Sequence, residues 1–306
     1  MVASGLIDVH QHLVPTDYRA AIDAATGGSI GGIPQPAWDE DSMLARMHAL
    51  NIERAVLSVS TPALAPISAA DRPALARSCN QTMADLKARH PGALGGFALL
   101  PLPDVEATLT EIAYALDVLH LDGVGVLTNY DGRYLGDRLF EPVLAELDRR
   151  RTVVHVHPNL PPPAADSRLL LPAPVLEFTF DTTRMIAELI LTETLARYPD
   201  LKLVLSHLGG TLPWSAWRLS MLDDLPAADG GRREPVRDQL RRLYYDLALS
   251  ASPEALQTAA EVVGSERLLY GSDIPFAPPP FVDRNLAQVS ADLTARTRDN
   301  TARLFS

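Results

Sequence analysis

The stretch that decides the fold is Leu6-Ile7-Asp8-Val9-His10-Gln11-His12, an apolar run near the start of the chain that ends in two histidines one residue apart. The run predicts a β-strand, and side chains in a strand alternate between its two faces. His10 and His12 are therefore expected to point the same way from one strand end. Two imidazoles so placed are suited to hold a metal ion, although they would also fit as ordinary histidines of a half-buried strand.

Seven further apolar runs rich in β-branched residues follow, and helical patterns separate most of them. We expect strands near residues 6–10, 54–60, 95–100, 123–128, 152–157, 202–206, 243–248 and 267–272. We expect helices at residues 39–50, with Asp39 as the cap, and at 68–90, 104–118, 138–149, 181–197, 213–223, 253–263 and 285–304. Strand followed by helix, eight times over, is the pattern of a (β/α)8 TIM barrel in the α/β class.

The length of 306 residues suits one such barrel with modest insertions, so a single domain over residues 1–306 is predicted. A doubly wound open sheet would need a glycine-rich phosphate loop after an early strand, and the sequence has none there. Two segments interrupt the alternation, the glycine-rich residues 25–37 and the proline-rich residues 158–174. Both follow predicted strands, at the C-terminal face of a barrel, so we expect them to shape the mouth of a pocket rather than to be plain surface loops.

The composition argues against several classes of partner. The net charge is -11 without a basic block, which disfavours nucleic acid and an anionic membrane as partners. The single cysteine, Cys79, cannot form an internal disulfide, so a reducing cytoplasm is expected. The first residues lack the features of a signal peptide, and no apolar run approaches the length of a membrane span.

Four of the predicted strands end in residues that carry chemistry. These residues are, in chain order, His10 and His12, then His155 and His157, then His207 with Gly209 and Gly210, and finally Asp273. All four strand ends meet at the C-terminal mouth of a barrel. Three neutral imidazoles and one carboxylate make a coordination set for Zn²⁺ or another divalent first-row ion.

The assignment within this set rests on position. His157 lies one pleat nearer the mouth than His155, so we predict His157 as a ligand and His155 as a deeper interior group. The two glycines after His207 let the backbone turn sharply and leave the ring over the pocket. Asp273 can act as a fourth ligand, as a proton carrier or as both, and a helix cap is its plain alternative. The other histidines fall in or at the ends of predicted helices and are expected at the surface: His48, His90 and His120.

These motifs resemble the amidohydrolase superfamily. The matching residues are His10-x-His12, His157-Pro158, Ser-His-Leu-Gly-Gly at 206–210 and Gly-Ser-Asp-Ile-Pro at 271–275. Within the superfamily they are similar to the branch that holds aminocarboxymuconate-semialdehyde decarboxylase and the salicylate- and resorcylate-type decarboxylases. The similarity runs nearly from end to end, down to residues 300–305, and residues 127–137 most resemble the 6-methylsalicylate decarboxylase-like members.

The resemblance implies one divalent ion, with Zn²⁺ expected first and Mn²⁺ second. It also implies that His10, His12, His157 and Asp273 bind this ion and that His207 is the catalytic acid/base. Binuclear members of the superfamily usually bridge two metals with a carbamylated lysine at the end of the fourth strand. The only two lysines of this chain are Lys87 and Lys202, and neither lies at that position, so a lysine-bridged pair is excluded.

The substrate expectation rests on matched and missing arginines. The aminocarboxymuconate enzyme holds a substrate carboxylate with an arginine at the position matched here by Met43, so a dicarboxylate of that kind is disfavoured. A second family arginine, donated across a dimer interface, is matched by Arg218. We expect Arg218 and Asn129 to bind substrate, and we expect a homodimer or a higher homo-oligomer. An aromatic monoacid with one ring hydroxyl suits this pattern.

The leading functional hypothesis is non-oxidative decarboxylation of a hydroxyarenecarboxylic acid, with release of CO₂. His207 or Asp273 must supply the proton to the ring carbon, and the sequence leaves both open. The alternative enzyme class is a hydrolase of a lactone, C–C or C–N bond that uses a metal-activated water, because the same ligand set serves both chemistries. A non-catalytic metal-binding or sensor protein is the third reading. An open site with His207 to spare is more than metal storage needs.

Overall fold

The barrel is built from eight parallel strands that form one sheet. In this computed structural model, which describes residues 5–30, 33–160 and 171–306, neighbouring strands follow one another in chain order. The strands are β1 (Leu6–His12), β4 (Ile52–Ser58), β5 (Leu94–Leu99), β6 (Gly123–Leu127), β9 (Val153–His157), β10 (Lys202–Leu205), β11 (Tyr244–Asp246) and β12 (Leu268–Leu269). Parallel bridges from Asp8 to Tyr270 and from Gln11 to Ile274 join the first strand to the last. The predicted (β/α)8 barrel is thus confirmed.

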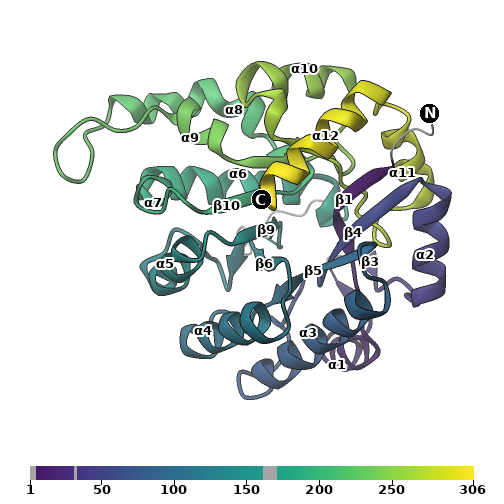
Figure 1. Cartoon of the computed structure of the whole chain (residues 1–306). Coiled ribbons are helices and arrows are strands. Elements are labelled where there is room, and N and C mark those ends of the chain that lie inside the picture. The colour runs from purple at the N-terminus through teal and green to yellow at the C-terminus, as the bar shows by residue number, and fades with distance from the viewer. Residues whose placement is uncertain (1–4, 31–32, 161–170) are drawn as a thin grey trace.

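The helices lie around the outside of the strands, and the C-terminus lies near the centre of the view, over one end of the barrel (Figure 1). They are α1 (Thr16–Thr26), α2 (Glu40–Ala49), α3 (Arg72–Arg89), α4 (Val105–Ala113), α5 (Glu141–Arg149), α6 (Ala173–Leu191), α7 (Thr194–Arg197), α8 (Leu212–Leu219), α9 (Val236–Arg242), α10 (Pro253–Val262), α11 (Pro279–Leu286) and α12 (Ala291–Leu304). Two short antiparallel pairs, β2 (Ser29–Ile30) with β3 (Ile33–Pro34) and β7 (Asn129–Tyr130) with β8 (Arg133–Tyr134), follow β1 and β6. None of the helices in the described part of the chain is long and apolar enough to cross a membrane.

Local sequence explains most helix boundaries. The Asp39 side chain accepts a hydrogen bond from the backbone N–H of Ser42 at 2.8 Å, so the predicted cap of α2 is confirmed. The helix expected at residues 285–304 is instead two helices, because Ser290 caps a new start by accepting from Leu293 N. Helices α1 and α9 were not expected, since each buries only two apolar side chains, Tyr18 and Ile22 in α1 and Val236 and Leu240 in α9. Helix α6 begins at Ala173, well before the expected residue 181.

Two apolar layers hold the barrel together. One fills the interface between the strands and the surrounding helices. The other lies inside the barrel and takes one residue from each of seven strands: Val9, Val56, Phe97, Val153, Val204, Tyr244 and Leu269. Leu304 and Phe305 pack against this inner layer at the end of the chain. At about 25 cal/mol per Å² of buried apolar surface, these layers are the main source of stability.

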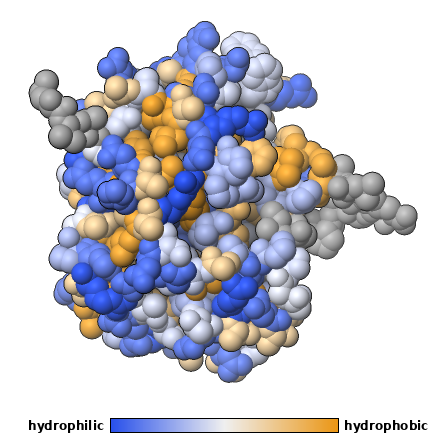
Figure 2. All heavy atoms as spheres, turned by 90° about the vertical axis from the view of Figure 1, so that its right-hand side faces the viewer, coloured by the Kyte–Doolittle hydropathy of each residue, from blue (hydrophilic) through white to orange (hydrophobic). Residues whose placement is uncertain are grey.

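The surface is mixed. Figure 2 shows the face at the right of Figure 1, on which α2 and α11 lie, and there hydrophilic side chains surround smaller hydrophobic areas. The expected surface positions of His48 and His120 are confirmed, and His90 is half-buried beside Glu40. Of the two segments expected to shape the mouth, residues 25–37 hold the end of α1 and the β2–β3 pair. Residues 161–170 of the second segment lie outside the described residues.

Candidate metal centre

Four buried side chains converge at the mouth of the barrel. His10, His12, His157 and Asp273 each offer one ligand atom, and these four atoms lie within 4.8 Å of one another. The Nε2 atoms of His10 and His12 are 3.0 Å apart, and the Asp273 Oδ1 lies 3.0 Å from His12 Nε2 and 3.5 Å from His10 Nε2. All four side chains are nearly inaccessible to solvent. The structure therefore brings together the four residues that the sequence assigned to a metal.

The strand ends explain this convergence. The register of β1 against β4 shifts between Asp8 and Gln11, as at a β-bulge, so Val9 joins the inner apolar layer while His10 and His12 face the centre. His157 is the last residue of β9. Asp273 follows β12 in a left-handed conformation (φ 62°), and its backbone N–H donates to His10 O at 2.8 Å.

Each of the three histidines is held by its Nδ1 atom. His10 Nδ1 lies 2.9 Å from the Asp246 carboxylate, His12 Nδ1 lies 3.1 Å from Ser58 Oγ, and His157 Nδ1 lies 2.8 Å from Pro158 O. A ring nitrogen held in this way by a carbonyl or carboxylate carries the proton and leaves the Nε2 lone pair free. Two such lone pairs and an adjacent carboxylate oxygen, packed this closely without solvent, are the donor set that a divalent ion of the zinc type fits.

The electrostatics of the cluster favour the metal-binding forms of His12, His157 and Asp273, whereas the charge of Asp246 outweighs burial at His10 and raises its pKa to about 9. Burial, together with the neighbouring histidines, lowers the pKa of His157 well below its usual value, so its ring stays neutral. Burial also lowers the pKa of His12. Burial alone would raise the pKa of Asp273, but the hydrogen bond from His12 and the charge of His10 outweigh it, and the pKa is lowered. Neutral imidazoles and an ionised carboxylate are the forms that bind a metal, so His10 releases a proton when an ion binds.

His207 lies beside these residues on a strained turn. His207 and Leu208 both have positive φ (53° and 59°), and Gly209 and Gly210 follow with positive φ as well. A side chain at Gly210 would meet Thr179 O at 2.0 Å, so this position requires glycine. The ring centroid of His207 lies 5.0 Å from that of His10 and 5.8 Å from that of His157. The sharp turn expected from the two glycines is confirmed.

Asp246, the last residue of β11, belongs to the site although no sequence motif predicts it. Its Oδ2 contacts His10 Nδ1, and its Oδ1 accepts from the backbone N–H groups of His207 and Ala248, both at 3.0 Å. His155, stacked face to face on Phe97 at 5.4 Å, lies with its Nε2 3.5 Å from the same carboxylate. An acidic residue inside the apolar run Leu-Tyr-Tyr-Asp-Leu was the available signal. His155 is the deeper interior group that its position predicted.

A second buried aspartate locks the first strand to the last. Asp8 accepts hydrogen bonds from the Ser272 hydroxyl at 2.5 Å and from the backbone N–H groups of Ser272 and His10. Burial raises the pKa of Asp8 to about 7, despite these hydrogen bonds. These contacts lie outside the metal cluster and join the backbone of β1 to the segment that follows β12.

The two residues expected to bind substrate lie apart from the four-residue cluster. Asn129, buried at the start of β7, donates from its side-chain nitrogen to Leu160 O at 3.1 Å and to Asp181 at 2.8 Å, and its oxygen accepts from Gly132 N. Its polar atoms are thus engaged in holding the loop. Arg218 is exposed near the end of α8. Their roles toward substrate stay predictions.

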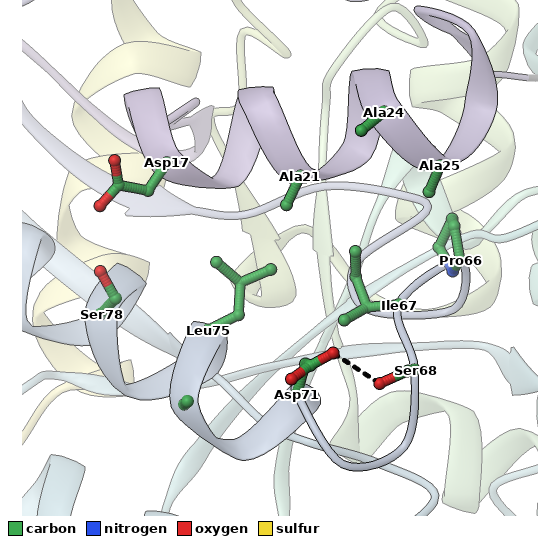
Figure 3. A pocket seen from close by; sticks show the side chains of 11 residues that line it. Asp17, Ala21, Ala24, Ala25, Pro66, Ile67, Ser68, Asp71, Leu75 and Ser78 are labelled. Atoms are coloured by element: carbon green, nitrogen blue, oxygen red, sulfur yellow. Dashed lines mark hydrogen bonds between the residues drawn. The ribbon is translucent and has the colours of Figure 1, made fainter.

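The cavities differ in chemistry. A groove of about 620 Å³ lies between α1 and α3, where Ala21, Ala24 and Leu75 face one another (Figure 3). Its carboxylates, Asp17 and Asp71, have no histidine beside them among the groove residues, so it is not where the chemistry lies. A smaller cavity of about 160 Å³ adjoins His12 instead, and its lining is Gln11, Ala37, Trp38, Asp39, Ser42, Met43, Arg46, Ile274, Pro275, Ala277 and Pro279.

The fold and the cluster define a barrel protein with a buried site fit for one divalent ion. The chain belongs to the amidohydrolase family, whose model matches residues 7–305, so the expected family is confirmed. It is 35% identical to a 6-methylsalicylic acid decarboxylase of Aspergillus aculeatus over 98% of this chain and 95% of that protein. It is 36% identical to the 6-methylsalicylic acid decarboxylase of Penicillium expansum over 89% and 85%.

Solved structures confirm the fold. A structure described as an amidohydrolase II superposes with a TM-score of 0.90 at 29% identity, covering 98% of this chain and 99% of that one. The dihydroxybenzoic acid decarboxylase of Polaromonas sp. JS666, solved with manganese and 2-nitroresorcinol, superposes with a TM-score of 0.85 at 22% identity, covering 99% and 97%.

Proposed function

We propose that the protein is a metal-dependent carboxy-lyase that removes CO₂ from a hydroxyarenecarboxylic acid of the salicylate type. The observation that carries the proposal is the cluster of His10, His12, His157 and Asp273 at the mouth of a barrel whose curated relatives are 6-methylsalicylic acid decarboxylases. The alternative, a hydrolase with a metal-activated water, uses the same donors. No relative named above favours it.

These four residues would hold one divalent ion, Zn²⁺ or Mn²⁺. When bound, the ion supplies positive charge that neutralises the substrate oxygens and fixes their geometry. Manganese is present in solved decarboxylases of this fold, and the histidine-rich donor set also suits zinc. The rings of Phe276 and Phe178 contact His12 and His157 edge-on at 5.3 and 5.9 Å, so apolar walls flank the donors and limit the access of water.

The chain's own residues then manage the proton. Direct loss of CO₂ from an aromatic ring would leave an aryl carbanion, so the ring carbon that bears the carboxylate must be protonated first. His207 donates its Nδ1–H to Ala248 O at 3.0 Å, which leaves Nε2 as the nitrogen that exchanges a proton with the substrate. Asp273 is the other candidate donor, and its lowered pKa makes it the weaker acid–base match near neutral pH. Release of CO₂ restores aromaticity.

The test is direct. The protein is loaded with Zn²⁺ or Mn²⁺ and incubated separately with 6-methylsalicylate, 2,6-dihydroxybenzoate and an aryl lactone. We expect metal-dependent CO₂, followed by mass spectrometry, from at least one of the hydroxy acids. Hydrolysis of the lactone with no CO₂ from any hydroxy acid would refute the decarboxylase and support the hydrolase.

We also propose that the active form is a homodimer formed through α6 and α8. These helices adjoin one another, since Thr183 on α6 bonds Thr211 at the start of α8. They and the segment after α8 expose large apolar side chains: Val175 (63%), Phe180 (40%), Trp214 (84%), Trp217 (87%) and Met221 (64%). So much exposed apolar surface is typical of an interface. Arg218 lies on α8 among these residues, and in the proposed dimer it would bind the substrate carboxylate in the neighbouring subunit's pocket.

Complementation tests this arrangement. Arg218→Ala and His157→Ala chains, each inactive alone, are mixed under conditions of confirmed subunit exchange. Each mixed dimer would then contain one intact pocket, so activity should recover toward about half of normal per mixed dimer. Absence of recovery would place Arg218 in its own subunit's site or outside the chemistry. A monomer in sedimentation would refute the dimer itself.

A further inference from the structure

The carboxylate of Asp246 contacts both His10, a proposed metal ligand, and His207, the proposed acid/base. Its Oδ2 contacts the ring of His10, and its Oδ1 accepts from the backbone of His207 and Ala248. We infer that Asp246 is a positioning residue that fixes the tautomer of His10 and the seat of His207 at the same time. The inference rests on the proposed metal site, and it assigns a role to a residue that contacts neither the ion nor the substrate.

His10 is the first residue that Asp246 positions. A carboxylate only accepts hydrogen bonds, so the 2.9 Å contact requires a proton on His10 Nδ1, and Nε2 is then the nitrogen that carries the lone pair whenever the ring is neutral. That Nε2 is the atom that lies 3.0 Å from His12 Nε2 and 3.5 Å from Asp273 Oδ1. Of the three Nδ1 anchors in the cluster, only this one is a carboxylate, and it is fully buried. It therefore holds its ring most strongly.

His207 is the second residue that Asp246 positions. Its backbone takes a left-handed conformation (φ 53°) that is unfavourable for a residue other than glycine. The Asp246 Oδ1 accepts from the N–H of this residue and from Ala248 N, and Ala248 O in turn accepts the Nδ1–H of His207. Asp246 Oδ1 thereby fixes both the backbone of His207 and the position of Ala248, whose carbonyl accepts the hydrogen bond from the His207 ring. The ring can then present only Nε2 to the pocket.

A structural brace and a second metal site are the rival explanations. His10, His155 and Asp246 also form a group whose ligand atoms lie within 4.8 Å of one another. The His10 Nδ1 to Asp246 Oδ2 separation is, however, that of a direct hydrogen bond, and Phe97 stacks on His155. The metal affinity and the metal stoichiometry of an Asp246 variant distinguish both alternatives from a positioning role.

Asp246→Asn is the informative variant. Because Asn Oδ1 must keep accepting from two backbone N–H groups, the new amide nitrogen takes the place of Oδ2 and directs an N–H at His10 Nδ1. His10 is then driven to the tautomer with its proton on Nε2, which cannot bind a metal. We expect metal affinity, measured by chelator competition, to fall about 10–100-fold while the fold is kept. Turnover at saturating metal should fall as well, with KM changed less than kcat.

Asp8→Asn is the matched control. Asp8 is equally buried, but it accepts from backbone N–H groups and from the Ser272 hydroxyl, and it contacts no ring. A hydroxyl can rotate to accept from the new amide, so this variant satisfies its partners. We expect it to bind the metal within about threefold of the wild-type affinity. Equal metal affinity in the two variants would overturn the positioning role and leave Asp246 a brace.

The tautomer can also be read without a variant of Asp246 and without metal. In metal-free wild-type protein with ¹⁵N-labelled histidine, assigned by comparison with His10→Gln, the His10 signals should report a proton on Nδ1. A proton on Nε2 alone would overturn the inference, even if Asp246→Asn fails to fold. Two ions per wild-type chain, with one lost in Asp246→Asn, would make Asp246 a ligand instead. Failure of wild-type protein to bind any metal would refute the proposed metal site while leaving the tautomer result to decide the role of Asp246.

Discussion

The interior of this barrel has two levels that differ in almost every physical property. Strand β9 shows the contrast within five residues, because Val153 belongs to the apolar inner layer while His157 ends in the metal cluster. The lower level is hydrocarbon and stabilises the fold. The upper level buries histidines and aspartates, whose desolvation costs stability unless each has a partner. The same face of one strand therefore contributes to a stabilising layer at its start and to a functional layer at its end.

The largest expected effect is at the upper level. His157→Ala should abolish metal binding and activity, because it removes one of four donors. His155→Ala, two residues away on the same strand, should keep close to one ion per chain. Elemental analysis of both variants checks this. Metal kept by His157→Ala and lost by His155→Ala would reverse the assignment of the two histidines, and two tightly held ions in wild-type protein would contradict a mononuclear site.

His207→Ala should separate metal binding from catalysis at the same level. Its ring is expected to move a proton, so the variant should keep the metal and lose about 10²–10⁴-fold in kcat. Steady-state kinetics with metal analysis measures both quantities. Unchanged turnover would make His207 a structural residue, and loss of the metal would make it a ligand.

Phe97→Ala tests the lower level. Phe97 is fully buried between His155 and Phe305, so its removal should cost about 3–5 kcal/mol in the free energy of unfolding. The metal stoichiometry of the folded fraction should stay near that of the wild type. Phe281→Ala on α11, where the ring is 50% exposed, is the control and should change stability by less than about 0.5 kcal/mol. Urea unfolding distinguishes the two, and equal effects would contradict a distinct inner layer.

The outer shell of helices should give the smallest effect. Hydrogen bonds from Arg89 and then His90 lower the pKa of Glu40 to about 2. Because this value lies below that of the unfolded chain, the stabilisation is present above about pH 4.5 and is lost as the pH falls toward 2. Glu40→Gln should lower the Tm by no more than about 2 °C at pH 7 and by nothing near pH 2. A larger shift that persists at low pH would have another cause.

The fold could be predicted from the sequence because each strand of a parallel barrel is a local apolar run that can be recognised on its own. Most of the site could be predicted for a related reason, since His12, His157 and Asp273 each end or follow such a run. Asp246 stands out locally only as an acidic residue in an apolar run, and its role depends on partners 39 and 236 residues away that this run does not reveal. Helix α1 was missed because Tyr18 and Ile22 alone mark its buried face. Local periodicity predicts which face of an element is buried, but it does not predict which residues that face contacts.

The closure of the barrel by its two ends sets the order in which the site can form. His12 and Asp273, whose side chains meet at 3.0 Å, are separated by 261 residues. A chain emerging from the ribosome exposes His10 and His12 early and can complete the donor set only after β12 has left the exit tunnel. Any ion held by all four donors would thus bind after the last strand has closed against the first. Metal binding would then be the last step of folding. Because the ion would bind only the closed barrel, it would stabilise the contact between the first and last strands.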